Sequence, residues 1–139
     1  MTGLLIGVAT FAAMEGVSYA THRWVMHGFG MRWHRSHHQR RTGRFERNDL
    51  FPVVFASIGI SLFALGMWPV AIGMTAYGAV YAYVHDLVIH RRLPAPEVRG
   101  PYLRWLVEAH ADHHATSGEP YGMLLPLVRS SARTARARL

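Results

Sequence analysis

Histidine is the residue of this chain whose number and spacing point to chemistry. The 139 residues hold 10 histidines, and every one of them falls into a cluster. Two clusters are pairs with the spacing H-x-x-x-x-H, and two are triples with the spacing H-x-x-H-H. The pairs are His22 with His27 and His85 with His90, and the triples are His34, His37, His38 and His110, His113, His114. The order pair, triple, pair, triple predicts one shared site rather than scattered helix caps.

Helical geometry gives the triples and the pairs different roles. Offsets of three and four residues place side chains on one face of a helix, one turn apart. Each triple therefore brings three imidazoles together, as a metal ion requires. An offset of five rotates a side chain by about 140° in a regular α-helix. We therefore expect each pair to reach two neighbouring ions, or to include one ligand from beyond a helix end.

Ten imidazoles exceed the coordination of one ion and favour two ions with about five ligands each. Imidazole suits Zn, Cu, Fe and Ni, so the ligand type alone leaves zinc open. As cations these histidines would repel one another and the nearby arginines, and metal-bound neutral imidazole removes that repulsion. The chain has no cysteine and no lysine, which excludes thiolate sites, disulfides and Schiff-base chemistry. The Glu-x-x-His pattern of soluble di-iron bundles is also missing.

The elements that must position these histidines are apolar helices. From Gly3 to Thr21 the only charged residue is Glu15, and from Leu50 to Val84 there is none. A soluble domain of this size gives each helix a polar face. Nineteen helical residues span about 28 Å, close to the roughly 30 Å of a bilayer's hydrocarbon core. The pattern predicts an all-α integral membrane helical bundle forming a single domain, 1–139, with spans at 3–21, 50–68 and 69–84.

Local signals refine these helices. Residues 66–69, Gly-Met-Trp-Pro, can turn the chain between the second and third spans. Asn48 or Asp49 is expected to cap the helix that begins at residue 50. A cleaved signal peptide is the competing interpretation of residues 3–21. It is disfavoured because no basic region precedes the apolar stretch.

The distribution of arginine predicts the orientation of the chain in the membrane. Arginines occur in 22–49 and 85–139 but not in residues 1–21 or in the turn at 66–69. The positive-inside rule then places the N-terminus outside, and the histidine-rich dimetal site and the C-terminus in the cytoplasm. Residues 129–139 are a basic tail suited to anionic headgroups. The net charge of +7 does not predict a nucleic-acid partner, because apolar spans interrupt the basic segments. A metal-storage or metal-transport protein is the non-enzymatic alternative, disfavoured because all ligands lie on one side.

Several strings around the histidines resemble a known family. They are His22-Arg23-Trp24-Val25-Met26-His27-Gly28, Trp33-His34-Arg35-Ser36-His37-His38, Glu46-Arg47-Asn48-Asp49-Leu50, Gly73-Met74-Thr75-Ala76-Tyr77-Gly78, Val84-His85-Asp86 and Ala109-His110-Ala111-Asp112-His113-His114. The chain resembles the carotenoid branch of the membrane fatty acid hydroxylase/sterol desaturase superfamily over about residues 11–122. The segment after His114 is shorter than is usual in that family.

The resemblance implies an O₂-dependent di-iron monooxygenase of the cell inner membrane. Its substrate would be a carotenoid dissolved in membrane lipid, hydroxylated at C3 of its β-ionone rings, from β-carotene through β-cryptoxanthin to zeaxanthin. Electrons would come from reduced ferredoxin, or from NAD(P)H through a reductase. The alternative is a hydroxylase or desaturase of the same superfamily acting on a fatty acyl or sterol substrate. Superfamily analogy assigns His27, His34, His37, His85 and His110 to one iron, and His22, His38, His90, His113 and His114 to the other.

Other polar residues are candidates for supporting roles. Asp86 and Asp112 are the favoured acceptors of N–H bonds from metal-bound imidazoles, followed by Asp49 and Glu108. Glu15 lies within a span, where a carboxyl group is costly. We expect its partner to be a ligand histidine or an arginine. The third span carries candidate residues for lining a polyene channel, and these are Met74, Tyr77, Tyr81 and Tyr83.

Overall fold

Helices account for all the regular structure that the chain shows. The computed structural model describes residues 1–39, 43, 45–94 and 97–128, which contain no strand. The order is α1 (Thr2–Ala20), η1 (Thr21–Phe29), α2 (Met31–His34), η2 (Arg47–Asp49), α3 (Leu50–Ala64), α4 (Trp68–Ala82), η3 (Tyr83–Ile89) and α5 (Pro101–Thr116). The all-helical class predicted from sequence is confirmed.

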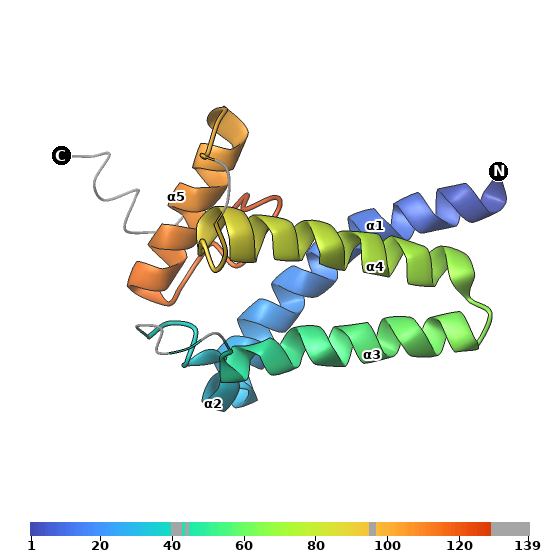
Figure 1. Ribbon diagram of the computed structural model, residues 1–139, viewed down its shortest axis with the longest axis horizontal. Coiled ribbons are helices and arrows are strands. Elements are labelled where there is room, and N and C mark those ends of the chain that lie inside the picture. The colour runs from blue at the N-terminus through green and yellow to red at the C-terminus, as the bar shows by residue number, and fades with distance from the viewer. Residues whose placement is uncertain (40–42, 44, 95–96, 129–139) are drawn as a thin grey trace.

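The helices α3 and α4 form an antiparallel hairpin, as expected (Figure 1). Gly66, with a φ of 74°, closes the turn, and Pro69 lies in the first turn of α4. A positive φ costs glycine little because it has no Cβ, and proline at a helix start loses no hydrogen bond. The second span therefore ends at Ala64 rather than at residue 68.

The helix α1 packs against α4 at very short range. A Cβ added at Gly73 would lie 2.9 Å from Cβ of Thr10 and would also collide with the carbonyl oxygen of Gly7. Small residues at a helix crossing allow backbones to approach closely, which is the usual packing device inside membranes. Next to this crossing, Met14 of α1 is buried against Met74 and Tyr77 of α4.

Large apolar side chains on the outer faces of these helices are exposed. Leu4 is 74% exposed, Val53 59% and Ile60 69%. A helix that is apolar all round belongs in a membrane unless protein covers it. Two helical stretches of the described residues, Thr2–Phe29 and Arg47–Ala64, are long and apolar enough to cross a bilayer. The third expected span, 69–84, lies on α4 and the first two residues of η3, and it is not among these stretches.

Every histidine-bearing element lies at one end of the bundle. The start of α1 and the turn between α3 and α4 lie at the opposite end (Figure 1). The helix α5 contacts η3, and α2 contacts η1 and η2. The helices α1, α3 and α4 thus form an apolar stem, and the remaining elements form a histidine-rich head.

The expected cap of α3 is wrong. Asp49 stands at the N-cap position but makes no side-chain cap bond. Its carboxylate instead accepts the N–H of Glu46 at 3.0 Å, within the short helix η2, and Arg92 lies on its other side. Asn48 is directed toward His34. Both residues are engaged in the histidine-rich head rather than in ending a helix.

Candidate metal centre

Two π-helical segments bring the paired histidines together. His22 and His27 lie in η1, with ring centroids 5.2 Å apart, and His85 and His90 at η3 are 4.5 Å apart. The N–H of His90 donates to the carbonyl of His85 at 2.9 Å, the five-residue bond of a π-helix. The expectation that each pair reaches two ions is wrong, because the wider π-helix turns residues five apart toward the same side and keeps each pair together. The alternative, a ligand from beyond a helix end, holds for His90, which follows the last residue of η3.

The two triples are built differently. His110, His113 and His114 lie on α5, as the spacing predicts. In the other triple, α2 ends at His34, and residues 37 and 38 lie in the turns that follow. The turns still keep the three rings close, because the centroids of His34 and His38 are 4.8 Å apart.

The ligand nitrogens form two groups, within each of which the atoms lie within 4.8 Å of one another. The five-histidine group consists of His22, His27, His34, His38 and His113, and the four-histidine group of His37, His85, His90 and His110. His114 lies beside the second group, with its Nε2 2.9 Å from Nε2 of His110. This grouping differs from the one assigned by superfamily analogy. It follows from the fold, which sends His37 toward η3 and leaves His34 and His38 beside η1.

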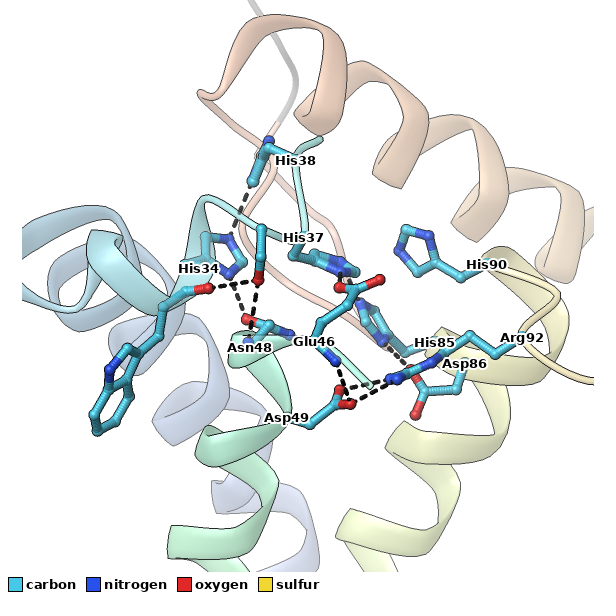
Figure 2. A network of polar contacts seen from close by, with 12 residues as sticks. His34, His37, His38, Glu46, Asn48, Asp49, His85, Asp86, His90 and Arg92 are labelled. Atoms are coloured by element: carbon cyan, nitrogen blue, oxygen red, sulfur yellow. Dashed lines mark hydrogen bonds and ion pairs between the residues drawn. The ribbon is translucent and has the colours of Figure 1, made fainter. Parts of the chain in front are cut away.

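The Nδ1 atoms of five histidines face hydrogen-bond acceptors, and Figure 2 shows three of these contacts, at His34, His37 and His85. The pairs are His22 with the Tyr121 carbonyl (3.0 Å), His34 with Asn48 Oδ1 (2.7 Å), His37 with Glu46 Oε2 (3.3 Å), His85 with Asp86 Oδ1 (2.8 Å) and His113 with the Gly118 carbonyl (2.6 Å). Carbonyl and carboxylate oxygens only accept, so each of these Nδ1 atoms carries the proton. The Nε2 atom of each neutral ring is then left with its lone pair.

The lone pairs converge, which is the arrangement that a cation requires. Nε2 of His22 lies 3.2 Å from Nε2 of His34, and Nε2 of His37 lies 3.0 Å from Nε2 of His85. In each of these contacts two acceptors face each other without a proton between them. Such contacts are repulsive unless a positive charge sits among them. The residues therefore fit two metal ions.

Burial keeps the rings neutral. Desolvation, helped by neighbouring imidazoles, lowers the pKa of His34 and of His113 to about 4 and that of His114 to about 2. For the same reasons the pKa values of His37 and His110 lie well below the ordinary range. Neutral imidazole is the form that binds metal, so the site is ready for ions at neutral pH.

The candidate acidic residues divide into three cases. Asp86 accepts from an imidazole, as expected. Asp49 touches no histidine directly and reaches the site through Glu46 and through Arg92, which donates to both of its oxygens at 2.7 Å. The carboxylate of Asp112 contacts no histidine in the described part of the chain, and Glu108 lies on the exposed side of α5. The preference for Asp112 is therefore wrong, since its side chain leaves the helix on another face.

Sequence reasoning missed Glu46 and Asn48. Glu46 contacts Nδ1 of His37, 9 residues before it, and Asn48 contacts Nδ1 of His34, 14 residues before it. The available signal was their position beside Asp49 in the string Glu46-Arg47-Asn48-Asp49-Leu50, which was noted only as a resemblance.

Glu15 has partners that the sequence did not suggest. Its carboxylate accepts the backbone N–H groups of Met123 (2.9 Å), Leu124 (3.0 Å) and Leu125 (2.9 Å). The hydroxyl of Tyr77 also donates to it at 2.7 Å. The expectation of a histidine or arginine partner is wrong, because the C-terminal segment returns to the apolar stem and supplies unpaired N–H groups there.

An apolar cavity of about 370 Å³ lies between α1, α3 and α4. Its walls include Phe51, Phe55, Met74, Tyr77 and Tyr81. Tyr83 is absent from the lining and 48% exposed, so its predicted role is not supported. At the head of the cavity stand His22 and His85, one from each histidine group. The cavity therefore leads from the apolar stem to both groups at once.

Comparison with known families agrees with this geometry. The fatty acid hydroxylase family matches residues 7–132. The chain belongs to the fatty acid hydroxylase family. Several bacterial proteins similar to this chain are named beta-carotene hydroxylase. One from Pseudescherichia vulneris is 49% identical over 121 residues, covering 82% of this chain and 69% of that protein.

Two further relatives carry the same name. The protein from Pantoea ananas is 46% identical over 122 residues, covering 83% of this chain and 70% of its own. The protein from Paracoccus sp. (strain N81106 / MBIC 01143) is 43% identical over 129 residues, covering 87% and 80%. No solved structure matches this family member. The family resemblance inferred from the histidine strings is thereby confirmed.

Proposed function

We propose that this chain is a membrane monooxygenase that hydroxylates C3 of carotenoid β-rings. The substrate class is supported by the bacterial relatives, which are named beta-carotene hydroxylase and are 43% to 49% identical to it. The expected products from β-carotene are β-cryptoxanthin and then zeaxanthin.

The observation that carries the proposal is the cavity between α1, α3 and α4. Its volume of about 370 Å³ lies in the range of ligand pockets, ~300–1,000 Å³. Its apolar walls suit a hydrocarbon ring with its adjoining polyene. A ring at the head of the cavity would face His22 and His85, and hence both groups of ligands.

A ring methylene has neither an acidic proton nor a leaving group, so acid–base catalysis by side chains cannot hydroxylate it. We propose two iron ions, held by the ten histidines in the two groups, with His114 completing the four-histidine group. Iron supplied with O₂, two electrons and two protons can deliver one oxygen atom to a C–H bond and release the other as water. Reduced ferredoxin, or NAD(P)H through a reductase, is the proposed electron source.

In this proposal, the chain's own residues bind the substrate ring and orient the histidine ligands. The apolar walls of the cavity exclude water and hold the ring against the histidine-rich head. The acceptors at Nδ1 keep each proton away from the ligand nitrogen and fix the plane of the ring. Asp86 has this role at His85, and Asn48 has it at His34.

We further propose a multi-pass arrangement in the cell inner membrane, with α1, α3 and α4 crossing and the histidine-rich head in the cytoplasm. The support comes from the arginine distribution and from the exposed apolar faces of the stem. The turn between α3 and α4 would then face the opposite side, together with the N-terminus.

The experiment is expression in a host that accumulates β-carotene, followed by pigment analysis. We expect zeaxanthin with some β-cryptoxanthin. His37→Ala and His113→Ala, one from each group, should reduce product by more than about 100-fold, since even residues that only orient ligands are worth ~10–100-fold. Both variants should remain in the membrane fraction.

Two results would count against the proposal. Unchanged pigments together with a newly hydroxylated fatty acid or sterol would overturn the substrate class but leave the metal centre standing. Full activity of either alanine variant would show that the histidine concerned is not a required ligand.

A further inference from the structure

The two histidine groups differ in the charge of the atoms that hold their Nδ1 protons. In the five-histidine group all the acceptors are neutral. They are the backbone carbonyls of Tyr121 and Gly118 and the amide oxygen of Asn48, which face His22, His113 and His34. Across the described residues, no carboxylate contacts an imidazole nitrogen of this group.

In the four-histidine group two of the Nδ1 atoms, those of His37 and His85, face carboxylates. Glu46 Oε2 lies 3.3 Å from Nδ1 of His37, and Asp86 Oδ1 lies 2.8 Å from Nδ1 of His85 (Figure 2). Both acids are largely shielded, with side chains 11% and 29% exposed. Shielding from water strengthens their effect on the adjacent rings.

Further contacts fix these carboxylates in place. The side chain of Glu46 accepts the backbone N–H of Asp49, and the N–H of Glu46 donates back to the Asp49 carboxylate at 3.0 Å. Arg92 donates to both oxygens of Asp49, and its Nη1 lies 3.4 Å from Asp86 Oδ1 (Figure 2). One arginine thus links the two acidic positions that border the cavity.

The charge of the acceptor at Nδ1 changes the electron density on the ligand nitrogen, Nε2. A carboxylate that accepts the Nδ1–H of an imidazole draws that proton toward itself and leaves more electron density on Nε2. A neutral carbonyl does this more weakly. The number of ligands does not offset the difference, because Nε2 of His114 stands 2.9 Å from Nε2 of His110 and can bring the four-histidine group to five.

We propose that the two ions are bound unequally, with the ion of the four-histidine group held more tightly because carboxylates support its ligands. The ion of the five-histidine group, supported by neutral oxygens, is the one that exchanges first. This inference rests on the proposed two-metal site. It makes Glu46, Asp86 and Asn48 positioning residues that also set affinity.

The test measures metal retention by the full chain in detergent. Protein loaded with Co²⁺ is equilibrated with a graded series of a chelator, and the metal remaining per chain is determined by elemental analysis. The wild-type protein should lose its ions in two separate steps. Asp86→Asn or Glu46→Gln should shift the tighter step by about 10–100-fold toward weaker binding, without moving the other step.

A carboxylate can also be added to the five-histidine group, which is the opposite change. Asn48→Asp places a carboxylate at His34 with almost no change in shape, and it should shift the weaker step toward tighter binding. Asp112→Asn is the matched control. It makes the same chemical change on α5, where the described structure shows no contact between that carboxylate and a histidine, and it should leave both steps in place.

Three results would overturn the inference. They are simultaneous loss of both ions from the wild type, a shift of the weaker step by Asp86→Asn, and a shift by Asp112→Asn as large as that by Asp86→Asn. Should Asp86→Asn not fold, the other two variants still test the inference. Glu46→Gln should shift the tighter step toward weaker binding, and Asn48→Asp should shift the weaker step toward tighter binding. A wild-type protein that binds a single ion would instead refute the two-metal part of the proposed function.

Discussion

Five of the ten imidazoles in the histidine-rich head have an acceptor that assigns the proton to Nδ1 and leaves Nε2 free. The acceptor at Nδ1 comes from a side chain at His34 and His85 and from the backbone at His22 and His113. Burial then opposes a second proton on the same ring. Two factors therefore set the protonation of these histidines. The acceptor fixes the proton on Nδ1, and burial keeps a second proton off Nε2.

The lowered pKa values predict how the metal-free protein responds to acid. In the unfolded chain a histidine binds its proton below pH about 6.5. In the folded chain the pKa values of His34 and His113 are about 4 and that of His114 is about 2. Between these values the unfolded state binds more protons, so stability is full above pH about 6.5 and is lost as the pH falls toward 4.

Thermal unfolding of the metal-free protein in detergent, followed by circular dichroism, would measure this effect. We expect a constant midpoint above pH about 6.5 and a steady fall below it. Metal-loaded protein should resist to lower pH, because bound ions block protonation. Equal midpoints for the metal-free protein at neutral pH and at pH about 4.5 would contradict the assignment.

Among the elements, the crossing of α1 and α4 tolerates the least change. Gly73→Ala adds a methyl group 2.9 Å from Cβ of Thr10, and it also meets the backbone of Gly7. Overpacking of this kind costs about 1–3 kcal/mol. We expect a lower unfolding midpoint for the purified variant. Gly16→Ala on α1 is the control, since nothing lies within 4 Å of the added atom, and a comparable loss there would point to a general effect of alanine.

The segment after α5 depends on a single carboxylate in the stem. Glu15→Gln keeps the shape but removes the charge that three backbone N–H groups contact. Hydrogen bonds to a charged group contribute about 1.5–3 kcal/mol each, so we expect clear destabilisation and faster proteolysis near residues 121–128. Tyr77→Phe removes only the hydroxyl donor and should have a smaller effect. A variant at Glu15 as stable as the wild type would show that the N–H groups find other partners.

The elements also show where sequence reasoning succeeds and where it stops. Composition located α1, α3 and α4 to within a few residues, because an apolar run and a proline act locally. The π-helical form of η1 and η3 was not predicted, because hydrogen-bond spacing leaves no residue signature. The acceptors at His22 and His113 were not predictable either, since they are backbone carbonyls and every residue has one.

At the level of the whole molecule, the histidine-rich head lies at the end of the stem opposite the α3–α4 turn. All ten histidines therefore share one side if the stem crosses the bilayer. Reporter fusions after Gly66 and after Leu139 should report opposite compartments, with the second in the cytoplasm. A fusion in which Arg91, Arg99 and Arg104 are replaced by glutamine should report a weaker preference. Equal reporting from both wild-type fusions would refute the hairpin topology.

The bonds from Glu15 to the backbone at 123–125 also carry a consequence for biosynthesis. The chain emerges from the ribosome N-terminus first, so α1 enters the bilayer well before its partner segment has been made. During that interval the carboxyl group of Glu15 lacks its N–H donors, and a shallow position for α1 is the low-energy arrangement. The acceptors for His113 and His22 belong to the same late segment, at residues 118 and 121. The proposed two-metal site would therefore be complete only after this segment has been made, and a truncation before residue 118 would leave His113 and His22 without these acceptors.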